Sequence, residues 1–207
     1  MRKPFMSRDQ RIIIFTKNPE IGKCKTRLAA TIGDKAALSI YEQLLDYTIG
    51  FCKKLSFPKK VYYSSAISKF DRWSHSGFYK DKQVDGDLGE RMKAAFKKEF
   101  KDGAKSVVII GTDCAQINEL DIQEAFRLLF QHEVVIGPAD DGGYYLLGMN
   151  YLIPELFENK SWSSEYLMSE TVATLDANQI DYKLMDAKSD IDIEEDLAKE
   201  GFIQFYW

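Results

Sequence analysis

Cationic residues gather around a glycine in the first of four polar segments that follow apolar runs. This segment, residues 17–28 (KNPEIGKCKTRL), contains four cations around Gly22, namely Lys17, Lys23, Lys25 and Arg27. Loop amides and cationic side chains favour anions, so we predict a phosphate site here. The spacing of its residues does not match a Walker loop. The alternative interpretation is a solvated basic loop.

Acidic residues occupy two further segments. Asp113 follows the buried run 106–111 (SVVIIG), and Asp190 and Asp192 belong to residues 190–197 (DIDIEEDL). Carboxylates at such positions suit Mg²⁺ or Mn²⁺ beside a bound phosphate, and alternate residues of an extended segment face the same side. The alternatives are that Asp113 caps the following loop or helix, and that the later acids complement a helix dipole.

The fourth segment, residues 137–145 (GPADDGGYY), combines two acids, two adjacent glycines and two tyrosines. Glycine lets a backbone approach a sugar or small substrate closely, and Asp140 or Asp141 is a candidate proton acceptor. Asp-Gly-Gly is also an ordinary turn signal, and the tyrosines are compatible with a plain core position.

Strands and helices alternate in the pattern that would position these segments. Short apolar runs predict strands at residues 11–16, 59–64, 106–111, 134–137, 144–147 and 182–185. Helices are predicted from an N-cap at Asp34 and over residues 88–103, 122–130 and 164–178, with a short last helix from about Glu194. Such alternation favours a three-layer α/β/α fold with a mostly parallel sheet, and we expect one domain over residues 1–207. In such sheets, ligands bind beyond the carboxyl ends of the strands.

Composition excludes several classes of protein. The net charge is −4, with 45% hydrophobic and 29% charged residues, which argues against nucleic acid or an anionic membrane as a partner. No apolar run approaches the length of a membrane span, and no signal peptide is recognisable. The three cysteines are widely spaced, which argues against a disulfide framework or structural zinc and favours a cytoplasmic location.

Taken in order, the motifs resemble those of the nucleotide-diphospho-sugar transferase superfamily, the GT-A-like fold. The matching stretches are FTKNPEIGKCKTRLA, QVDGDLGERM, GTDCAQI, GPADDGGYYLLGM and DIDIEEDL. They are most similar to an uncharacterised bacterial family of glycosyltransferase-A-like, radical-SAM-associated transferases, which in turn resembles the 2-phospho-lactate guanylyltransferases. Two positions depart from that pattern, because Ala115 stands where Pro is expected and Ile193 where Thr is expected.

The resemblance implies roles for individual residues. Lys25 and Arg27 would hold nucleotide phosphates with help from Lys17 and Gly22, and Asp113 would be the main metal ligand. The other metal ligands would be Asp192 and, third, Asp190. The nucleobase pocket would comprise Gln83, Leu88, Gly89 and Arg91, and the substrate pocket Asp141, Gly142, Gly143 and Tyr144. Lys25, Arg27, Asp113 and Asp141 form the candidate catalytic group.

Three functions remain open at this point. In the first, a nucleoside triphosphate (NTP) gives its nucleoside monophosphate to a phosphorylated small molecule and pyrophosphate leaves. The dense cationic loop favours this one, because a triphosphate needs more countercharge than a diphosphate. In the second, a nucleotide-sugar is the donor of a glycosyl group, and an inverting reaction needs a base such as Asp140 or Asp141. The third is a non-catalytic nucleotide-binding module.

Overall fold

The computed structural model describes residues 9–75 and 77–198, and its seven strands form one sheet. The order across the sheet is β3-β2-β1-β4-β6-β5-β7, with β6 antiparallel to both of its neighbours and the other pairings parallel. The strands are β1 (Gln10–Thr16), β2 (Lys59–Tyr63), β3 (Phe78–Lys82), β4 (Ser106–Ile110), β5 (Val134–Pro138), β6 (Tyr144–Met149) and β7 (Tyr182–Leu184). The mostly parallel α/β fold is therefore confirmed.

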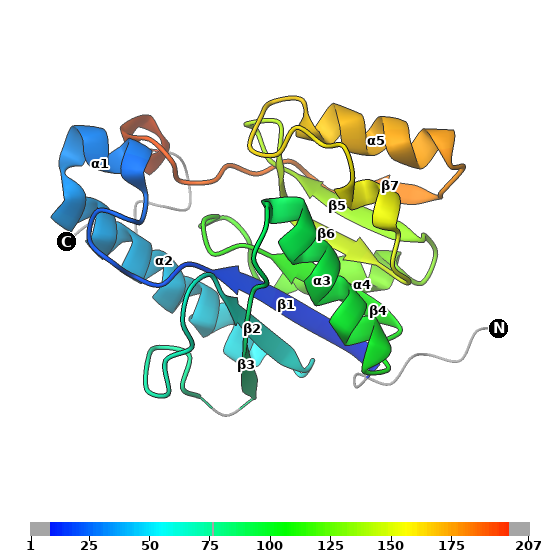
Figure 1. Cartoon of the computed structure of the whole chain (residues 1–207), viewed down its shortest axis with the longest axis horizontal. Helices are drawn as coiled ribbons and strands as arrows, with labels where there is room; N and C mark the ends of the chain where they lie inside the picture. Colours follow the sequence, from blue (N-terminus) through cyan, green and yellow to red (C-terminus); the bar gives the residue numbers. More distant parts are fainter. Residues whose placement is uncertain (1–8, 76, 199–207) are drawn as a thin grey trace.

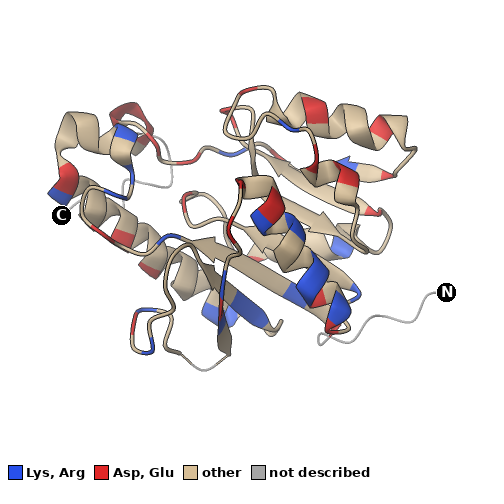
Figure 2. Ribbon diagram, in the orientation of Figure 1, with Lys and Arg blue, Asp and Glu red and all other residues tan. Residues whose placement is uncertain are grey.

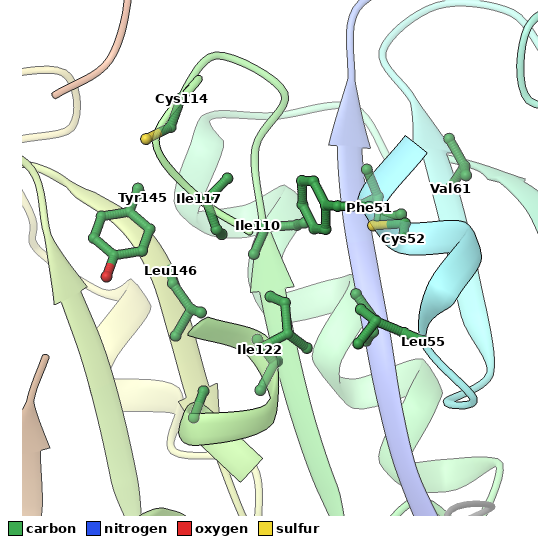
Figure 3. Close-up of a cluster of buried hydrophobic side chains, with 14 of the residues drawn as sticks. Phe51, Cys52, Leu55, Val61, Ile110, Cys114, Ile117, Ile122, Tyr145 and Leu146 are labelled. Carbon is green, nitrogen blue, oxygen red and sulfur yellow. The ribbon is translucent and has the colours of Figure 1, made fainter. Parts of the chain in front are cut away.

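Helices cover both faces of the sheet (Figure 1). The α-helices are α1 (Thr26–Ile32), α2 (Asp34–Lys54), α3 (Leu88–Lys101), α4 (Glu119–Leu128) and α5 (Leu167–Ala177), with short 3-10 helices at Pro154–Phe157 and Glu194–Ala198. Strands in the middle of the sheet are buried on both faces, so successive side chains of β1 enter different cores. Ile12 and Ile14 pack with α2 and α4, whereas Ile13 packs with α3 and α5. Figure 3 shows part of the core on the α2 and α4 side, where Phe51, Leu55 and Ile122 converge on the sheet.

The helix ends show one capping feature that was not predicted and one prediction that is wrong. Asp87 caps α3 in a capping box with Glu90, since each side chain accepts a hydrogen bond from the other residue's backbone N–H. The predicted N-cap at Asp34 is wrong, because Gly33 holds the cap position and Asp34 is the first helical residue. Strand β3 was not predicted, and the last predicted helix is a 3-10 helix.

The antiparallel β6 decides which loops meet. Residues 139–143 connect β5 to β6, a link far too short for a parallel crossover, so the chain turns directly back. The start of β6 therefore lies at the same edge as the carboxyl ends of β1, β4 and β5. After β7 the chain crosses above that edge to reach α1 (Figure 1), which brings residues 190–193 to the same place.

None of the helices among the described residues is long and apolar enough to cross a membrane.

Candidate active site

A cleft of about 490 Å³ opens at the carboxyl edge of the sheet. Most of the predicted site residues line it, namely Lys17, Lys25, Arg27, Gln83, Leu88, Arg91, Asp113, Asp141, Gly143, Tyr144, Asp190 and Asp192. These residues come from all four polar segments and from the start of α3. The structure thus brings together, in one cleft, residues that are up to 175 positions apart in the sequence.

A buried ammonium lies at the centre of the cleft. Lys25 Nζ is 2.7 Å from Asp113 Oδ1 and 3.2 Å from Asp192 Oδ1, and the Lys25 side chain is only 4% exposed. Arg27 forms an ion pair with the other oxygen of Asp192. A second contact holds the two acidic segments together, because the Ile191 N–H donates to the Asp113 carbonyl at 3.0 Å.

Both carboxylates remain partly accessible to a ligand, although each oxygen of Asp192 already has a protein partner. The Asp113 and Asp192 side chains are 40% and 35% exposed, although Asp113 lies deep in the cleft. Burial would raise the pKa of the Asp113 carboxyl, but Lys25 beside it lowers that pKa below its ordinary value. Burial likewise opposes the charge on Lys25, yet Asp113 and Asp192 outweigh it and raise the lysine pKa. At neutral pH these two groups are therefore an ion pair.

Asp190 behaves differently from its neighbours. It lines the same cleft, but its carboxyl makes no hydrogen bond or ion pair within the described part of the chain. Burial and then the charge of Asp113 raise the pKa of Asp190 to about 7. A carboxyl with this pKa gains or loses its proton close to neutral pH, unlike Asp113 beside it, which stays charged.

Within the cleft, the carboxylates suit a divalent cation at the point where Asp113 and Asp192 meet beside Lys25. Within residues 9–75 and 77–198, no three His, Cys, Asp or Glu side chains form a ready-made metal cluster. Two carboxylates do converge on the Lys25 ammonium, and Mg²⁺ is commonly held by one or two carboxylates together with substrate phosphates and water. Asp113 and Asp192 therefore fit such an ion, whereas Asp190 makes no direct contact with that point.

Hydrogen bonds to the backbone fix the polar side chains at the wall of the cleft that is predicted to hold the nucleobase. The Gln83 side chain is buried and its Nε2 donates to the Tyr62 carbonyl at 2.9 Å. Arg91 Nε donates to the Gly86 carbonyl at 2.8 Å, which fixes the side chain beside the first turn of α3. Leu88 is 39% exposed at this wall. An apolar side chain between fixed polar groups suits a planar base.

Three glycines predicted to touch ligand lie outside the cleft wall. Gly22 forms a turn with a positive φ of 73°. Gly89 packs against Trp162, and a Cβ there would stand 2.4 Å from the indole ring. Gly142 has a φ of 88°, and a Cβ on it would lie 2.3 Å from the Glu165 carbonyl oxygen. Each of these glycines shapes the backbone around the site rather than its surface.

Asp140 and Asp141, the two candidate proton acceptors after β5, differ in their position relative to the cleft. Asp140 does not line the cleft, because its carboxylate accepts a hydrogen bond from Ser189. Asp141 does line it, and its Oδ1 accepts from the Gly143 N–H at 2.9 Å within the turn. Of these two acids, only Asp141 is placed to meet a substrate.

Tyr41 was missed because its helical spacing looks like plain core. Its hydroxyl accepts from the Lys17 N–H at 2.8 Å and lies 3.3 Å from the hydroxyls of Thr16 and Thr112. Burial and the charge of Asp113 raise the pKa of Tyr41 to about 12, so it stays a neutral phenol. The available signal for a role of Tyr41 was a hydroxyl within an otherwise apolar helix face. Through these hydrogen bonds, Tyr41 holds the loops after β1 and β4 against α2.

Comparison with known proteins gives the family. Residues 52–164 match the family described as "Uncharacterized protein conserved in bacteria (DUF2064)". The protein belongs to this family. No curated protein matches the chain. The DUF2064 protein resembles a "putative nucleotide-diphospho-sugar transferase" from Desulfovibrio desulfuricans G20, with 26% identity, a TM-score of 0.85 and coverage of 96% of this chain and 94% of the other.

More distant structures share the fold. The inositol-1-phosphate CTP transferase of T. maritima is 12% identical, with a TM-score of 0.59 and coverage of 95% and 94%. Rv0371C from Mycobacterium tuberculosis H37Rv, solved in complex with manganese, is 9% identical, with a TM-score of 0.56 and coverage of 90% and 95%. The chain thus has the fold of the nucleotide-diphospho-sugar transferase superfamily, which it shares with the "putative nucleotide-diphospho-sugar transferase" and with a CTP transferase.

Proposed function

We propose that the protein is a metal-dependent nucleotidyltransferase that transfers a nucleoside monophosphate from an NTP to a phosphorylated small molecule. The observation that carries this proposal is the set of four cations lining one cleft with a pair of exposed carboxylates, namely Lys17, Lys25, Arg27 and Arg91 with Asp113 and Asp192. A triphosphate requires that density of countercharge, and a carboxylate pair suits the cation that accompanies it.

Each charged group has a task in this reaction. Asp113 and Asp192 would hold Mg²⁺ or Mn²⁺, which when bound neutralises charge on the reacting phosphates. Lys25 and Arg27 would bind the phosphates and take up the charge that develops on pyrophosphate as the bond to the α-phosphorus breaks. The acceptor phosphate is already an anion, so its oxygen attacks without a side-chain base. Asp141 and Tyr144 would then orient the acceptor.

A glycosyltransferase is the second candidate, and the position of Asp141 favours it. That carboxylate lines the cleft beside Gly143 and Tyr144, where it can accept a proton from an acceptor hydroxyl. The same carboxylate pair would then serve a nucleotide-sugar, and a nucleoside diphosphate (NDP) would leave.

An assay across a panel of donors distinguishes the candidates. The protein is first screened with Mg²⁺ and each NTP or nucleotide-sugar for an increase in melting temperature. Pyrophosphate and NDP release are then followed in parallel with phosphorylated and hydroxyl acceptors. We expect pyrophosphate from an NTP. NDP release without pyrophosphate would establish the glycosyltransferase, and binding without either product would leave a nucleotide-binding module.

Asp141→Asn supplies an independent criterion. If the acceptor is a phosphate, the variant changes KM more than kcat, because Asp141 only positions substrate. If an acceptor hydroxyl must lose a proton, kcat falls by about 10²–10⁴-fold.

A further inference from the structure

We propose that Lys25 excludes free divalent cations from the cleft, so that the metal enters only together with the nucleotide. The inference rests on the proposed function, because it assigns an order to the binding of metal and nucleotide at the same site. It concerns the state of the protein before any substrate has bound.

The Lys25 ammonium occupies the point at which Asp113 and Asp192 converge. Its Nζ lies 2.7 and 3.2 Å from one oxygen of each carboxylate, which is ordinary ion-pair geometry. A divalent ion of the size of Mg²⁺ needs those oxygens at about 2.1 Å. Both cations cannot occupy this point, so a metal that binds these two oxygens together must displace the ammonium.

The charges around that point already balance. Lys25 and Arg27 contribute two positive charges, and Asp113 and Asp192 contribute two negative charges that they contact directly. A free divalent cation therefore gains little electrostatic attraction on entering. It would also leave Lys25, whose side chain is 4% exposed, without a counterion.

The backbone fixes Lys25 in this place. Its φ of 51° and ψ of 46° put a non-glycine residue in the left-handed region. Such a conformation is strained for a residue with a side chain and persists only where the surroundings determine it. Packing near Lys25 supports it, because Cys24 before it and Leu28 in the first turn of α1 are buried. Lys25 is therefore a built-in part of the cleft rather than a mobile surface cation.

A nucleotide changes this balance. Its phosphates offer Lys25 and Arg27 new anionic partners within the same cleft, and the two carboxylates are then free to hold the metal. Each ligand consequently strengthens the binding of the other, and thermodynamic linkage requires the effect to be equal in both directions.

The test measures Mn²⁺ binding to the full chain by water-proton relaxation, which separates protein-bound Mn²⁺ from Mn²⁺ on free nucleotide. In the absence of nucleotide, Lys25→Met should bind Mn²⁺ about 10-fold or more tightly than the wild type, because a unit charge a few ångströms away is removed. Lys25→Gln should behave in the same way. Lys23→Met is the matched control, since Lys23 is 72% exposed, pairs with Glu20 and does not line the cleft.

The second arm uses the wild type alone, with the α,β-methylene analogues of ATP, CTP, GTP and UTP added singly. We expect Mn²⁺ affinity to rise about 10-fold or more with the analogue that binds, which is a coupling within the usual range. Equal Mn²⁺ affinity of wild type and both Lys25 variants would overturn the proposal. Binding of an analogue without any change in Mn²⁺ affinity would also overturn it.

Failure of the proposed function gives a different result. The proposed function fails if no pyrophosphate is released from any NTP, whether or not an analogue binds the wild type. The comparison of Lys25→Met and Lys25→Gln with the wild type needs no nucleotide and no turnover, so it still decides the role of Lys25.

Discussion

Two clusters of charged residues in this protein differ in the sign of the buried charge at their centre. In the Lys25 cluster (Lys25, Arg27, Asp113 and Asp192), a buried cation lies among half-exposed carboxylates. The Glu99 cluster has a carboxylate at its centre, 2% exposed, with cations around it. Glu99 on α3 accepts hydrogen bonds or ion pairs from Arg11, Lys60 and Tyr62 at 2.6–3.0 Å.

The difference lies in which atoms remain available. Both oxygens of Glu99 have protein donors, and none of the four residues in that cluster lines the cleft. Asp113 and Asp192 keep 40% and 35% exposure, and Asp190 beside them has no hydrogen-bond donor within the described chain. Both oxygens of Asp192 also have protein partners, so the two clusters differ in the exposure of their carboxylates. A buried carboxylate fastens a helix to a sheet, whereas partly exposed carboxylates can meet a ligand. Lys and Arg also occur together with acids along α3 (Figure 2), so charge alone does not mark the site.

The largest effect on function is expected from a substitution of Asp113 in the Lys25 cluster. Asp113→Asn removes a carboxylate that either transfer reaction requires, so we expect turnover to fall by about 10³-fold or more. Pyrophosphate release measures this loss, and circular dichroism shows whether the fold is retained. Turnover within a few-fold of the wild type would mean that this carboxylate does not serve the reaction.

At the other cluster, Glu99→Gln should cost stability and leave function intact. Among the described residues, Glu99 is the one carboxylate that pairs with both Arg11 and Lys60, although Lys60 also lies 3.7 Å from Asp102. Arg11 and Lys60 are 21% and 19% exposed. Breaking a buried pair costs about 3–5 kcal/mol, and this partial exposure of the cations places the expected loss near the lower bound. Urea denaturation measures the loss. A change in nucleotide affinity without a change in stability would contradict the assignment of this cluster to structure.

A smaller effect is expected at Arg27, which is 68% exposed. Arg27→Ala should weaken nucleotide binding by about 1–2 kcal/mol, since a charge-assisted contact to phosphate is lost from a partly solvated position. Calorimetry gives the affinity, and Lys23→Ala is the control because Lys23 carries the same charge outside the cleft. Equal affinity of all three proteins would identify the segment as a solvated basic loop.

The smallest expected effect concerns Tyr144. Its hydroxyl is buried without a hydrogen-bond partner among the described residues, and the side chain lines the cleft. Tyr144→Phe should therefore raise the free energy of unfolding by about 1 kcal/mol, because an unsatisfied polar group is removed. The same change should raise KM for the acceptor. Thermal denaturation and steady-state kinetics measure the two effects, and a variant that is less stable with an unchanged KM would contradict this role.

Sequence patterns predict most of the helices and strands, but few of the contacts between side chains that are distant in the sequence. Apolar β-branched runs mark β1 and β4, and Asp113 is recognisable because it follows one of them. Strand β3 (FYKDK) escapes, since an edge strand with only Phe78 fully buried lacks a clear alternating pattern. The reversal at β6 was readable from the short link at residues 139–143, because a parallel crossover requires a dozen or more residues.

The ion pair between Lys25 and Asp192 was beyond the reach of sequence patterns. Local spacing identifies a cation and an acid, but their contact depends on how the whole sheet brings residues 167 positions apart together. The same applies to Tyr41, whose hydroxyl serves loops that follow two different strands.

That separation has a consequence for biosynthesis. Lys25 leaves the ribosome long before Asp192, and Ile191, which binds the Asp113 carbonyl, also emerges late. A nascent chain therefore carries Lys25 with only the first of its two acids, Asp113, until residue 192 has been made. Local opening of the segment around residue 192 would return a finished molecule to the same incomplete state while the sheet stays folded. The charge cluster around Lys25 is thus completed only after most of the sheet has been synthesised.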